Sequence, residues 1–591
     1  MCLVQGTSVD TSYAKKSELE SVAPVSSVSG IGGMVTADNQ TASEVGVEIL
    51  RKGGDAADAA VATALMLGVL QPYASGIGGG GFAVVYRKDA GDDQTFALDF
   101  REVAPQKSVP DMYLDQAKNV IPQRSTKGAL AVAVPGEIAG LFELHKRYGK
   151  LPWSQLVAPA LRAAKDGFPM HPALYAQIQS KKVDLLKLEH YQKSFFRNDG
   201  TIKQVGELIQ LPHLANTLQA IAQHGRAGFY KGKVGETLVQ AVQSAGGIIT
   251  QADLASYQPK QRKVLRGTYR GFELHTMPPP SSGGVVILQV LQTLERLKYH
   301  TFAFDDAGAY HRLIEALKHA FADRASSLGD PDFGAPSILP LLSDQRISEI
   351  VRLFDATQTL SPEKYGALIQ APKDGGTSHF NVIDKQGNSI ALTTTINTSF
   401  GSKFIAGDTG VLLNNEMDDF VAKAGVPNAY GLLGQASNQI QAGKRPLSSM
   451  SPTLIFKDHE LIGMVGGSGG PTIITGTLQV LLRLLLSDIP SPDQAVRAAR
   501  IHHQWMPNLL FVDPDFPEKD RQSLTAFGHK VKPWTKRFNA IQALWKYADG
   551  CIEGASDPSK QGVPATVETK KCLTQVRVQK NVTCSKNCKK K

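Results

Sequence analysis

The chain has 591 residues, of which 42% are hydrophobic, a composition that is ordinary for a globular protein. Its formal charge of +10 is uneven, because residues 566–591 hold eight Lys or Arg and one Glu, which leaves only +3 on the rest. No aromatic residue lies among the lysines of this tail, so a nucleic-acid surface is not indicated. The most apolar run, Ala56–Leu70, is too short to span a membrane.

The first thirty residues are expected to be a leader or linker. No secretory signal is visible, since Met1–Gln5 lacks both a basic region and an apolar core. Thr41–Glu44 matches a capping box and predicts the start of a helix that stops at Gly53. A second, tightly packed helix is predicted over Ala56–Leu70.

A glycine-rich loop, Ser75–Phe82, leads into a predicted strand over Ala83–Tyr86. A phosphate-binding loop would carry Gly-Lys-Ser/Thr and open a helix, and this loop does neither. The favoured interpretation is close backbone packing.

The pattern changes along the second half of the chain. Residues 130–370 are mainly helical in pattern, and they include a rigid loop over Pro278–Gly284. From Thr377 onward, strand-like runs dominate, beginning with a hairpin signal between the first two. The runs are 378–384, 389–395, 411–420 and 453–466.

The five cysteines lie only at the ends of the chain. Cys2 is alone at the start, and the other four lie at 551, 572, 584 and 588. The Cys584–Cys588 spacing fits zinc poorly, with no His nearby. A free-thiol or disulfide-stapled appendage is the favoured interpretation.

Thr377 follows Gly375 and Gly376 and opens a strand-like run. A Thr hydroxyl needs an adjacent base to act as a nucleophile, and cleavage before the Thr would supply its own α-amino group. Cleavage between Gly376 and Thr377 would make the chain a proenzyme. By itself, the motif also fits an ordinary loop before a strand.

A second candidate nucleophile is Ser468, in the Gly-x-Ser-x-Gly pattern of residues 466–470. Asp513 or Asp515, followed by His529, would complete a serine-hydrolase triad in the right chain order. The same glycines could instead be a plain turn, or could present two N–H groups to an oxyanion whose nucleophile lies elsewhere. The sequence pattern by itself leaves these three uses open.

Groups suited to an amino-acid ligand surround Thr377 in the predicted arrangement. The hairpin places Thr393, Thr395 and Asn397 on one side of the sheet. Arg101 offers a bidentate clamp for a carboxylate, and residues 414–420 offer acids and amides for an ammonium group.

Several long motifs in order make the chain resemble the γ-glutamyltranspeptidases, also called glutathione hydrolases, from about Gly32 to about Pro564. The matching segments are 42–54, 75–82, 101–105, 278–284, 377–380, 397–401, 414–420, 444–452 and 469–470. The resemblance implies a mixed α/β, four-layer αββα N-terminal-nucleophile hydrolase fold with two stacked antiparallel sheets. It also implies four parts: a leader (1–30), a large chain (31–376), a small chain (377–565) that shares one core with it, and a tail (566–591), expected to be disordered.

The resemblance also implies a role for each site residue. Thr377 is the nucleophile for self-cleavage after Gly376 and for attack on the substrate, and Thr395 is its hydrogen-bond partner. The other implied roles are oxyanion stabilisation by Gly469 and Gly470, α-carboxylate binding by Arg101, Ser448 and Ser449, α-amino binding by Asn397, Glu416 and Asp419, and lid closure by Tyr430. Position 416 is Gln in some members and Glu here.

The implied activity is acyl transfer through a γ-glutamyl-Thr377 ester, from glutathione or another γ-glutamyl compound to water, an amino acid or a dipeptide. No cofactor or metal is required, and neither nucleic acid nor a membrane span is expected. The family likeness implies a periplasmic or extracellular location. Three alternatives remain: a cephalosporin (glutaryl) acylase of the same superfamily, a Ser468 hydrolase, and a non-catalytic relative that binds through its basic tail.

Overall fold

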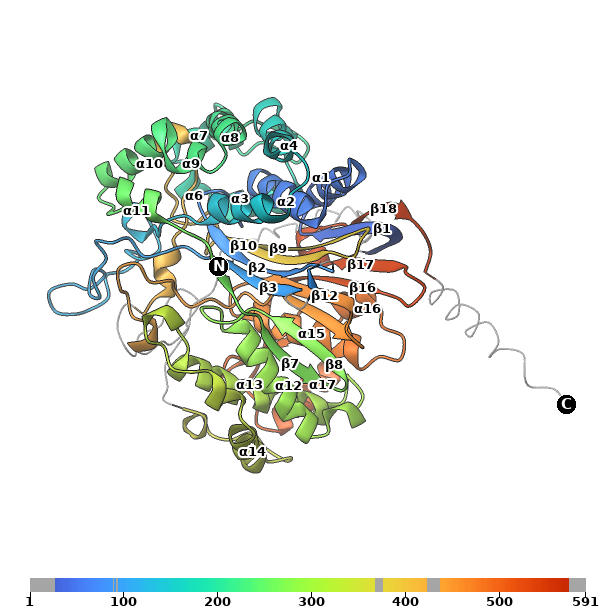
Figure 1. Cartoon of the computed structure of the whole chain (residues 1–591). Helices are drawn as coiled ribbons and strands as arrows, with labels where there is room; N and C mark the ends of the chain where they lie inside the picture. The colour runs from blue at the N-terminus through green and yellow to red at the C-terminus, as the bar shows by residue number, and fades with distance from the viewer. Residues whose placement is uncertain (1–26, 89, 92–93, 367–375, 422–435, 573–591) are drawn as a thin grey trace, which may run out of the picture.

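A curled sheet of thirteen antiparallel strands forms the centre of the structure, with helices above and below it (Figure 1). The structure is a computed structural model that describes residues 27–88, 90–91, 94–366, 376–421 and 436–572. In spatial order the strands are β6 (Lys260–Arg262), β3 (Thr95–Phe100), β2 (Gly80–Tyr86), β10 (Ser389–Thr395), β9 (Thr377–Asp384), β1 (Ser27–Ala37), β17 (Ile552–Ser556), β16 (Ala540–Lys546), β12 (Glu460–Ser468), β11 (Thr453–Lys457), β8 (Phe272–Thr276) and β7 (Leu265–Tyr269), and β18 (Ala565–Thr569) also pairs with β1.

The two halves of this sheet fold over one another, so that β12 contacts β9 and β10 face to face. Apolar side chains from both halves, such as Phe82 and Met464, form one cluster between them. The implied pair of separate stacked sheets is therefore corrected to one continuous sheet, because β1 pairs with β9 in one half and β17 in the other. The chain is a mixed α/β protein.

Helices cover both outer faces of the curled sheet (Figure 1). The first layer comprises α1 (Gln40–Arg51), α2 (Ala56–Leu70), α3 (Glu137–Tyr148), α4 (Trp153–Asp166), α8 (Pro212–His224) and α10 (Gly232–Ser244). The second comprises α12 (Gly283–Arg296), α13 (Ala307–Ser327), α15 (Thr472–Leu485) and α17 (Glu518–Ala526). Each layer has its own large apolar cluster against the sheet.

Helix α2 has the predicted bounds and is buried on every side. Its residues are nearly all Ala, Val or Leu, and the side chains of Asp55 and Asp58 form a capping box at its start. Helix α1 instead begins at Gln40, because the side chain of Asn39 accepts a hydrogen bond from the Ala42 N–H. The predicted cap at Thr41 is wrong by two residues.

The hairpin β9–β10 and the strands of 453–466 are confirmed, the latter as the hairpin β11–β12. The predicted strand over 411–420 is wrong. This segment makes isolated β-bridges at Leu412 and Leu413 and then forms a short 3₁₀ helix, η8 (Glu416–Asp419). That turn brings two acids to one place.

The glycine-rich loop packs backbone against backbone, as predicted. A Cβ atom on Gly79 would lie 1.9 Å from the carbonyl oxygen of Thr395, and one on Gly78 would lie 2.1 Å from that of Leu412. No side chain fits at either position, so the glycines let this loop lie directly against the end of β10.

Both ends of the described chain belong to the sheet. Strand β1 starts at Ser27, inside the expected leader, and β18 crosses the expected boundary of the tail at residue 566. A disulfide joins Cys551 to Cys572 just beyond β18. Residues 573–591 lie outside the described part of the chain.

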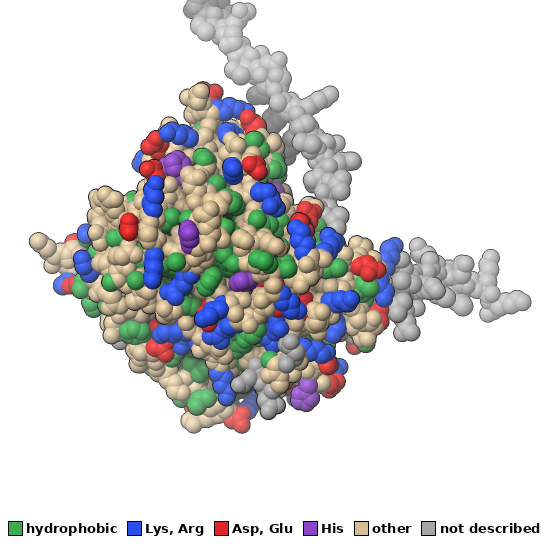
Figure 2. Space-filling view, turned by 45° about the horizontal axis from the view of Figure 1, so that its top comes forward, with side chains coloured by type: hydrophobic (Ala, Val, Ile, Leu, Met, Phe, Trp, Pro, Cys, Tyr) green, Lys and Arg blue, Asp and Glu red, His purple; other side chains and the backbone are tan. Residues whose placement is uncertain are grey.

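Charged side chains of both signs are interspersed over the face seen in Figure 2, with apolar side chains between them. Within the residues described, no helix is long and apolar enough to cross a membrane.

Glu137, the first residue of α3, lies buried between this helix and the sheet. Its carboxyl group accepts a 2.8 Å hydrogen bond from the hydroxyl of Thr394 in β10. Burial raises the pKa of Glu137 to about 8, and the nearby Glu102 adds to the rise. The folded protein therefore holds this carboxyl group in its neutral form near pH 7.

We expect Glu137→Gln to reduce the pH dependence of stability. In the unfolded chain Glu137 ionises near its ordinary pKa of 4.5, whereas the folded group ionises near 8, so wild-type stability falls as pH rises between these values. The slope from one such group is at most about 1.4 kcal/mol per pH unit. Tm measured from pH 5 to pH 8 should fall less in this variant than in Glu143→Gln, which changes a partly exposed residue of the same helix. Equal slopes would contradict the expectation.

Candidate active site

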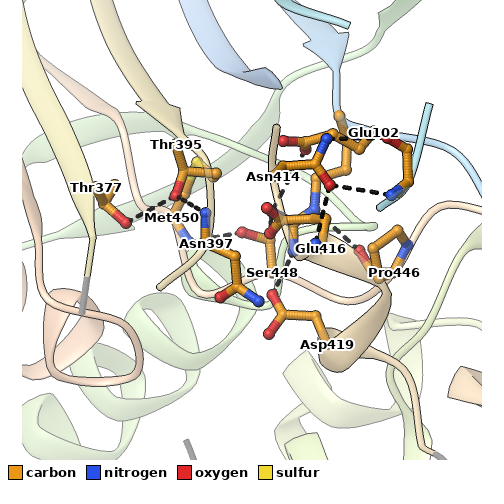
Figure 3. Close-up of polar contacts among 12 residues, drawn as sticks. Glu102, Thr377, Thr395, Asn397, Asn414, Glu416, Asp419, Pro446, Ser448 and Met450 are labelled. Atoms are coloured by element: carbon orange, nitrogen blue, oxygen red, sulfur yellow. Dashed lines mark hydrogen bonds and ion pairs between the residues drawn. The ribbon is translucent and has the colours of Figure 1, made fainter. Parts of the chain in front are cut away.

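Antiparallel pairing of β9 with β10 places Thr377 directly opposite Thr395. Their hydroxyl oxygens lie 3.1 Å apart (Figure 3). The Thr395 hydroxyl donates to the Gly376 carbonyl at 2.7 Å and accepts from the Asn397 N–H at 2.8 Å. Since its single proton goes to Gly376, the proton between the two hydroxyls comes from Thr377.

Gly376 is closely surrounded by backbone. A Cβ atom there would lie 2.7 Å from the Tyr73 carbonyl oxygen and 2.8 Å from that of Thr398. The Gly376 N–H donates to the Asn397 carbonyl at 3.0 Å. Gly376 is therefore held through both its N–H and its carbonyl, while Asp374 and Gly375 lie outside the described residues.

A cavity of about 290 Å³ opens beside the Thr377 hydroxyl. Nine of the residues singled out from the sequence line it: Arg101, Thr377, Thr395, Asn397, Glu416, Asp419, Ser448, Ser449 and Gly470. The tertiary structure thus gathers into one pocket residues from segments more than 300 positions apart. Tyr430 lies outside the described residues.

The Arg101 guanidinium, just after β3, is buried and ion-paired with two acids of η8. One nitrogen contacts a Glu416 carboxylate oxygen, and another lies 2.5 Å from Asp419 Oδ2. Arg101 also donates to the carbonyls of Pro446 and Leu447, each at 3.3 Å. The structure therefore pairs the predicted carboxylate clamp with the predicted ammonium-binding acids.

The acids outnumber the cation they surround. Burial raises the pKa values of Glu416 and Asp419, while Arg101 opposes both shifts. The charges of Glu102 and Asp419 raise the pKa of Glu416 further, whereas the hydrogen bond with Glu416 lowers that of Asp419. Glu102, 3.9 Å from Arg101, is also fully buried, and burial raises its pKa to about 7. Burial therefore favours the protonated form of each of these acids, and Arg101 favours the ionised form.

Ser448 and Ser449 are held against the loop that precedes α12. The Ser282 hydroxyl donates to the Ser448 carbonyl at 2.6 Å, and the Ser281 hydroxyl donates to the Met450 carbonyl at 2.5 Å. The Ser448 hydroxyl accepts from the Met450 N–H at 3.1 Å. These bonds attach residues 448–450, which line the cavity, to the predicted loop 278–284.

Gly469 and Gly470 join the end of β12 to the start of α15. Both have positive φ, +132° and +60°, which favours glycine. A Cβ atom on Gly469 would lie 2.6 Å from the Thr472 hydroxyl. The turn faces the cavity at the N-terminus of a helix, where the macrodipole favours negative charge.

The triad proposed around Ser468 is not formed. The Ser468 hydroxyl lies in β12 and donates to the Ala540 carbonyl at 3.5 Å. Both ring nitrogens of His529 have other partners, namely His311 at 2.9 Å and Lys318 at 3.4 Å. Asp513 accepts from the backbone N–H of Arg500. The elbow pattern is therefore a structural turn.

Comparison with known proteins settles the family. A gamma-glutamyltranspeptidase family model matches residues 42–567. The chain belongs to this family of enzymes. A glutathione hydrolase proenzyme of Escherichia coli (strain K12) is 39% identical over 527 residues, which cover 89% of this chain and 90% of the relative. Glutathione hydrolase 3 of Arabidopsis thaliana is 42% identical over 569 residues, covering 90% and 87%.

A solved structure from another branch of the fold is also similar. The cephalosporin acylase from Bacillus halodurans superposes with a TM-score of 0.80 at 27% identity, covering 96% of this chain and all of the acylase chain. The fold is thus shared with an enzyme named for a different substrate.

Sequence reasoning missed Arg324, which reaches the transpeptidase pocket from α13. It donates to the Ser282 hydroxyl at 2.7 Å and to the Ser449 hydroxyl at 3.3 Å. Burial lowers its pKa to about 10, and Asp419 opposes the shift. A signal was present, because Arg324 falls three and seven residues after Phe321 and Leu317, on the apolar stripe of the helix.

We expect Ser468→Ala to keep γ-glutamyl anilide hydrolysis within about twofold of wild type. The change removes one long hydrogen bond to a backbone carbonyl, a cost of about 1 kcal/mol in stability. Steady-state assay of the purified variant tests this. A loss of more than about a hundredfold, which serine nucleophiles show on removal, would restore Ser468 as the nucleophile.

Proposed function

We propose that the protein is an autoprocessing glutathione hydrolase and γ-glutamyltransferase whose nucleophile is Thr377. This proposal depends most on the contact between the hydroxyls of Thr377 and Thr395, whose oxygens lie 3.1 Å apart. The Thr395 hydroxyl also donates to the carbonyl of Gly376.

Self-cleavage follows from that geometry. The Thr395 hydroxyl polarises the Gly376 carbonyl, and the Thr377 oxygen attacks its carbon. The C–N bond then breaks and the hydroxyl proton passes to the leaving nitrogen, so that the Gly376–Thr377 amide becomes an ester. Water then hydrolyses the ester, leaving a carboxylate on Gly376 and a free α-amino group on Thr377. The products are a large chain ending at 376 and a small chain starting at 377, held together by the shared sheet.

The freed α-amino group is the base for the second reaction. It takes the proton of the Thr377 hydroxyl, which attacks the γ-carbonyl of the substrate. Collapse of the tetrahedral intermediate expels the amine, protonated by the same group, and leaves a γ-glutamyl ester on Thr377. Water or the amine of an amino acid or dipeptide then takes the acyl group. No cofactor or metal enters either step.

Gly469 and Gly470 are proposed to stabilise the oxyanion in this reaction. Their turn lines the pocket at the start of α15, where backbone N–H groups and the helix dipole both favour negative charge.

We propose that a bound substrate replaces the ion pairs of Arg101 with Glu416 and Asp419 by ion pairs of its own. The α-carboxylate would bind Arg101 and accept hydrogen bonds from Ser448 and Ser449. The α-ammonium would bind Glu416 and Asp419, with Asn397 beside them. The glutamyl zwitterion brings one charge of each sign, so every buried charge keeps a partner. Arg324 would support the carboxylate side through Ser449.

The two halves of the curled sheet are proposed to act as the two inner layers of the four-layer αββα fold. We also propose that the protein works outside the cytoplasm, in the periplasm or the extracellular space. The disulfide between Cys551 and Cys572 supports an oxidising compartment.

Thr377→Ala should abolish both reactions. On a denaturing gel, wild type should show fragments of 376 and 215 residues, about 40 and about 23 kDa of the 63.6 kDa chain. The variant should run as one band without γ-glutamyl anilide hydrolysis. Ser378→Ala is the matched control, since it removes the adjacent hydroxyl, which contacts Ser75 instead. Cleavage at this bond in the Thr377 variant would show the mechanism to be wrong.

A glutaryl acylase is the second candidate, favoured by the likeness to the cephalosporin acylase. A glutaryl group has no α-ammonium, so Glu416 and Asp419 would face it unpaired in a buried pocket, which is costly. These acids support a glutamyl substrate.

Asp419→Ala should separate the two candidates. Loss of a charged hydrogen bond to the ammonium costs about 1.5–3 kcal/mol, or about ten- to a hundredfold in kcat/KM for γ-glutamyl anilide. Hydrolysis of glutaryl anilide should change far less. Equal losses on both substrates, or a wild-type preference for the glutaryl compound, would favour the acylase.

A further inference from the structure

Lys560 contacts Thr377 and does not belong to the residues that line the pocket. It ends the short 3₁₀ helix η10 (Pro558–Lys560), which precedes β18. Its ammonium group donates to the carbonyl oxygen of Thr377 itself and, at 2.8 Å, to Asp38 Oδ2. No sequence motif singled out either residue.

The Lys560 side chain is held in place by its scaffold. Asp557, the N-cap of η10, is buried and ion-paired with the buried Arg500. Asp38 follows β1, and its carboxylate also accepts from Gln542 of β16 at 2.6 Å and from the backbone N–H of His379 at 3.3 Å. Asp38 therefore connects β1, β9, β16 and η10 around the start of the nucleophile strand.

The Lys560–Asp38 pair is shielded from water, with side-chain exposures of 16% and 0%. Burial raises the pKa of Asp38, and Lys560 opposes this by attraction and by its hydrogen bond. Removal of the lysine alone would leave a carboxylate buried without its counter-ion. The pair is thus a built feature of the fold and not a surface contact.

Covalent geometry brings the ammonium close to the α-nitrogen of Thr377. A residue's carbonyl oxygen lies about 3 Å from its own nitrogen, and Lys560 is hydrogen-bonded to that oxygen. A positive charge at about 4–6 Å disfavours protonation of an amine. A base must be neutral to accept the proton of the Thr377 hydroxyl.

We propose that Lys560 is a positioning residue of the nucleophile: it fixes the carbonyl of Thr377, and its positive charge keeps the α-amino group freed by self-cleavage in the neutral, basic form. This inference rests on the proposed function, because it assigns a role toward the amine that cleavage creates. Asp38 holds Lys560 in place, and its negative charge partly offsets the electrostatic effect of the Lys560 ammonium on the α-amino group.

Other charged or titratable groups face the start of β9 from the elements packed around it. His379 is neutral, since burial lowers its pKa to about 3, and burial raises the pKa of Tyr73, which is also neutral. Across the cavity lie Arg101, Glu416, Asp419 and Arg324. In the pocket, Arg101 is paired with Glu416 and Asp419, whereas Lys560 is hydrogen-bonded to Thr377 itself.

The test is the pH dependence of kcat/KM for γ-glutamyl anilide, measured on fully cleaved enzyme. Removing the charge in Lys560→Met should move the acid limb of the profile about one unit to higher pH, because the amine then holds its proton more tightly. Lys560→Arg keeps the charge and should leave the limb within about 0.3 unit of wild type. Lys88→Met, which removes an exposed ion-paired lysine, is the matched control.

A merely structural role would lower kcat/KM equally at every pH, and that outcome would overturn the inference. If Lys560→Met does not fold or cleave, the double variant Asp38→Asn/Lys560→Met removes both charges and should show a smaller shift in the same direction. If the acid limb of the pH profile of the double variant coincides with that of wild type, the inference is also overturned. Inactive wild-type enzyme would instead refute the proposed function, so the two failures are distinguishable.

Discussion

The hydroxyl of Thr395 is the fixed point on which the site depends. It contacts Thr377, donates to Gly376 and accepts from Asn397. The glycine-rich loop lies so close to the Thr395 carbonyl that no side chain fits between them. A hydroxyl held by three partners cannot rotate freely, and so the Thr377 hydroxyl oxygen and the Gly376 carbonyl keep one relative position.

Charge compensation sets the second constraint. The protein buries Arg101 among Glu102, Glu416 and Asp419, and it pairs Lys560 with the buried Asp38. Buried charges are tolerated only in pairs, so a ligand that enters must replace the partners it displaces. A glutamyl zwitterion meets that condition with one group of each sign. In the proposed mechanism, charge pairing thus governs both the choice of substrate and the protonation state of the Thr377 α-amino group.

The local elements of the fold were largely predictable. Helix α2 and the hairpin β9–β10 follow from apolar composition and period-2 alternation, which are local signals. The turn of acids at η8 was mistaken for a strand, because Val411–Leu413 has strand-like composition. This segment makes only isolated bridges, to Ile405 nearby and to Gly78, which lies hundreds of residues away. The pairing of β1 with both halves of the sheet was likewise not predictable, since the sequence of a strand does not specify which strands it pairs with.

The sequence by itself determined the kinds of groups available: a Thr after two glycines, a cation, two acids, paired hydroxyls and a glycine turn. Tertiary structure distinguishes the two candidate nucleophiles, which the local sequence patterns left open. Thr377 lines a cavity, whereas the groups proposed to assist Ser468 have other partners. Tertiary structure also brought in Arg324 and Lys560, whose roles depend on contacts across 125 and 183 positions. The physical reason is that hydrogen bonds and ion pairs act over a few ångströms of space, whatever the separation along the chain.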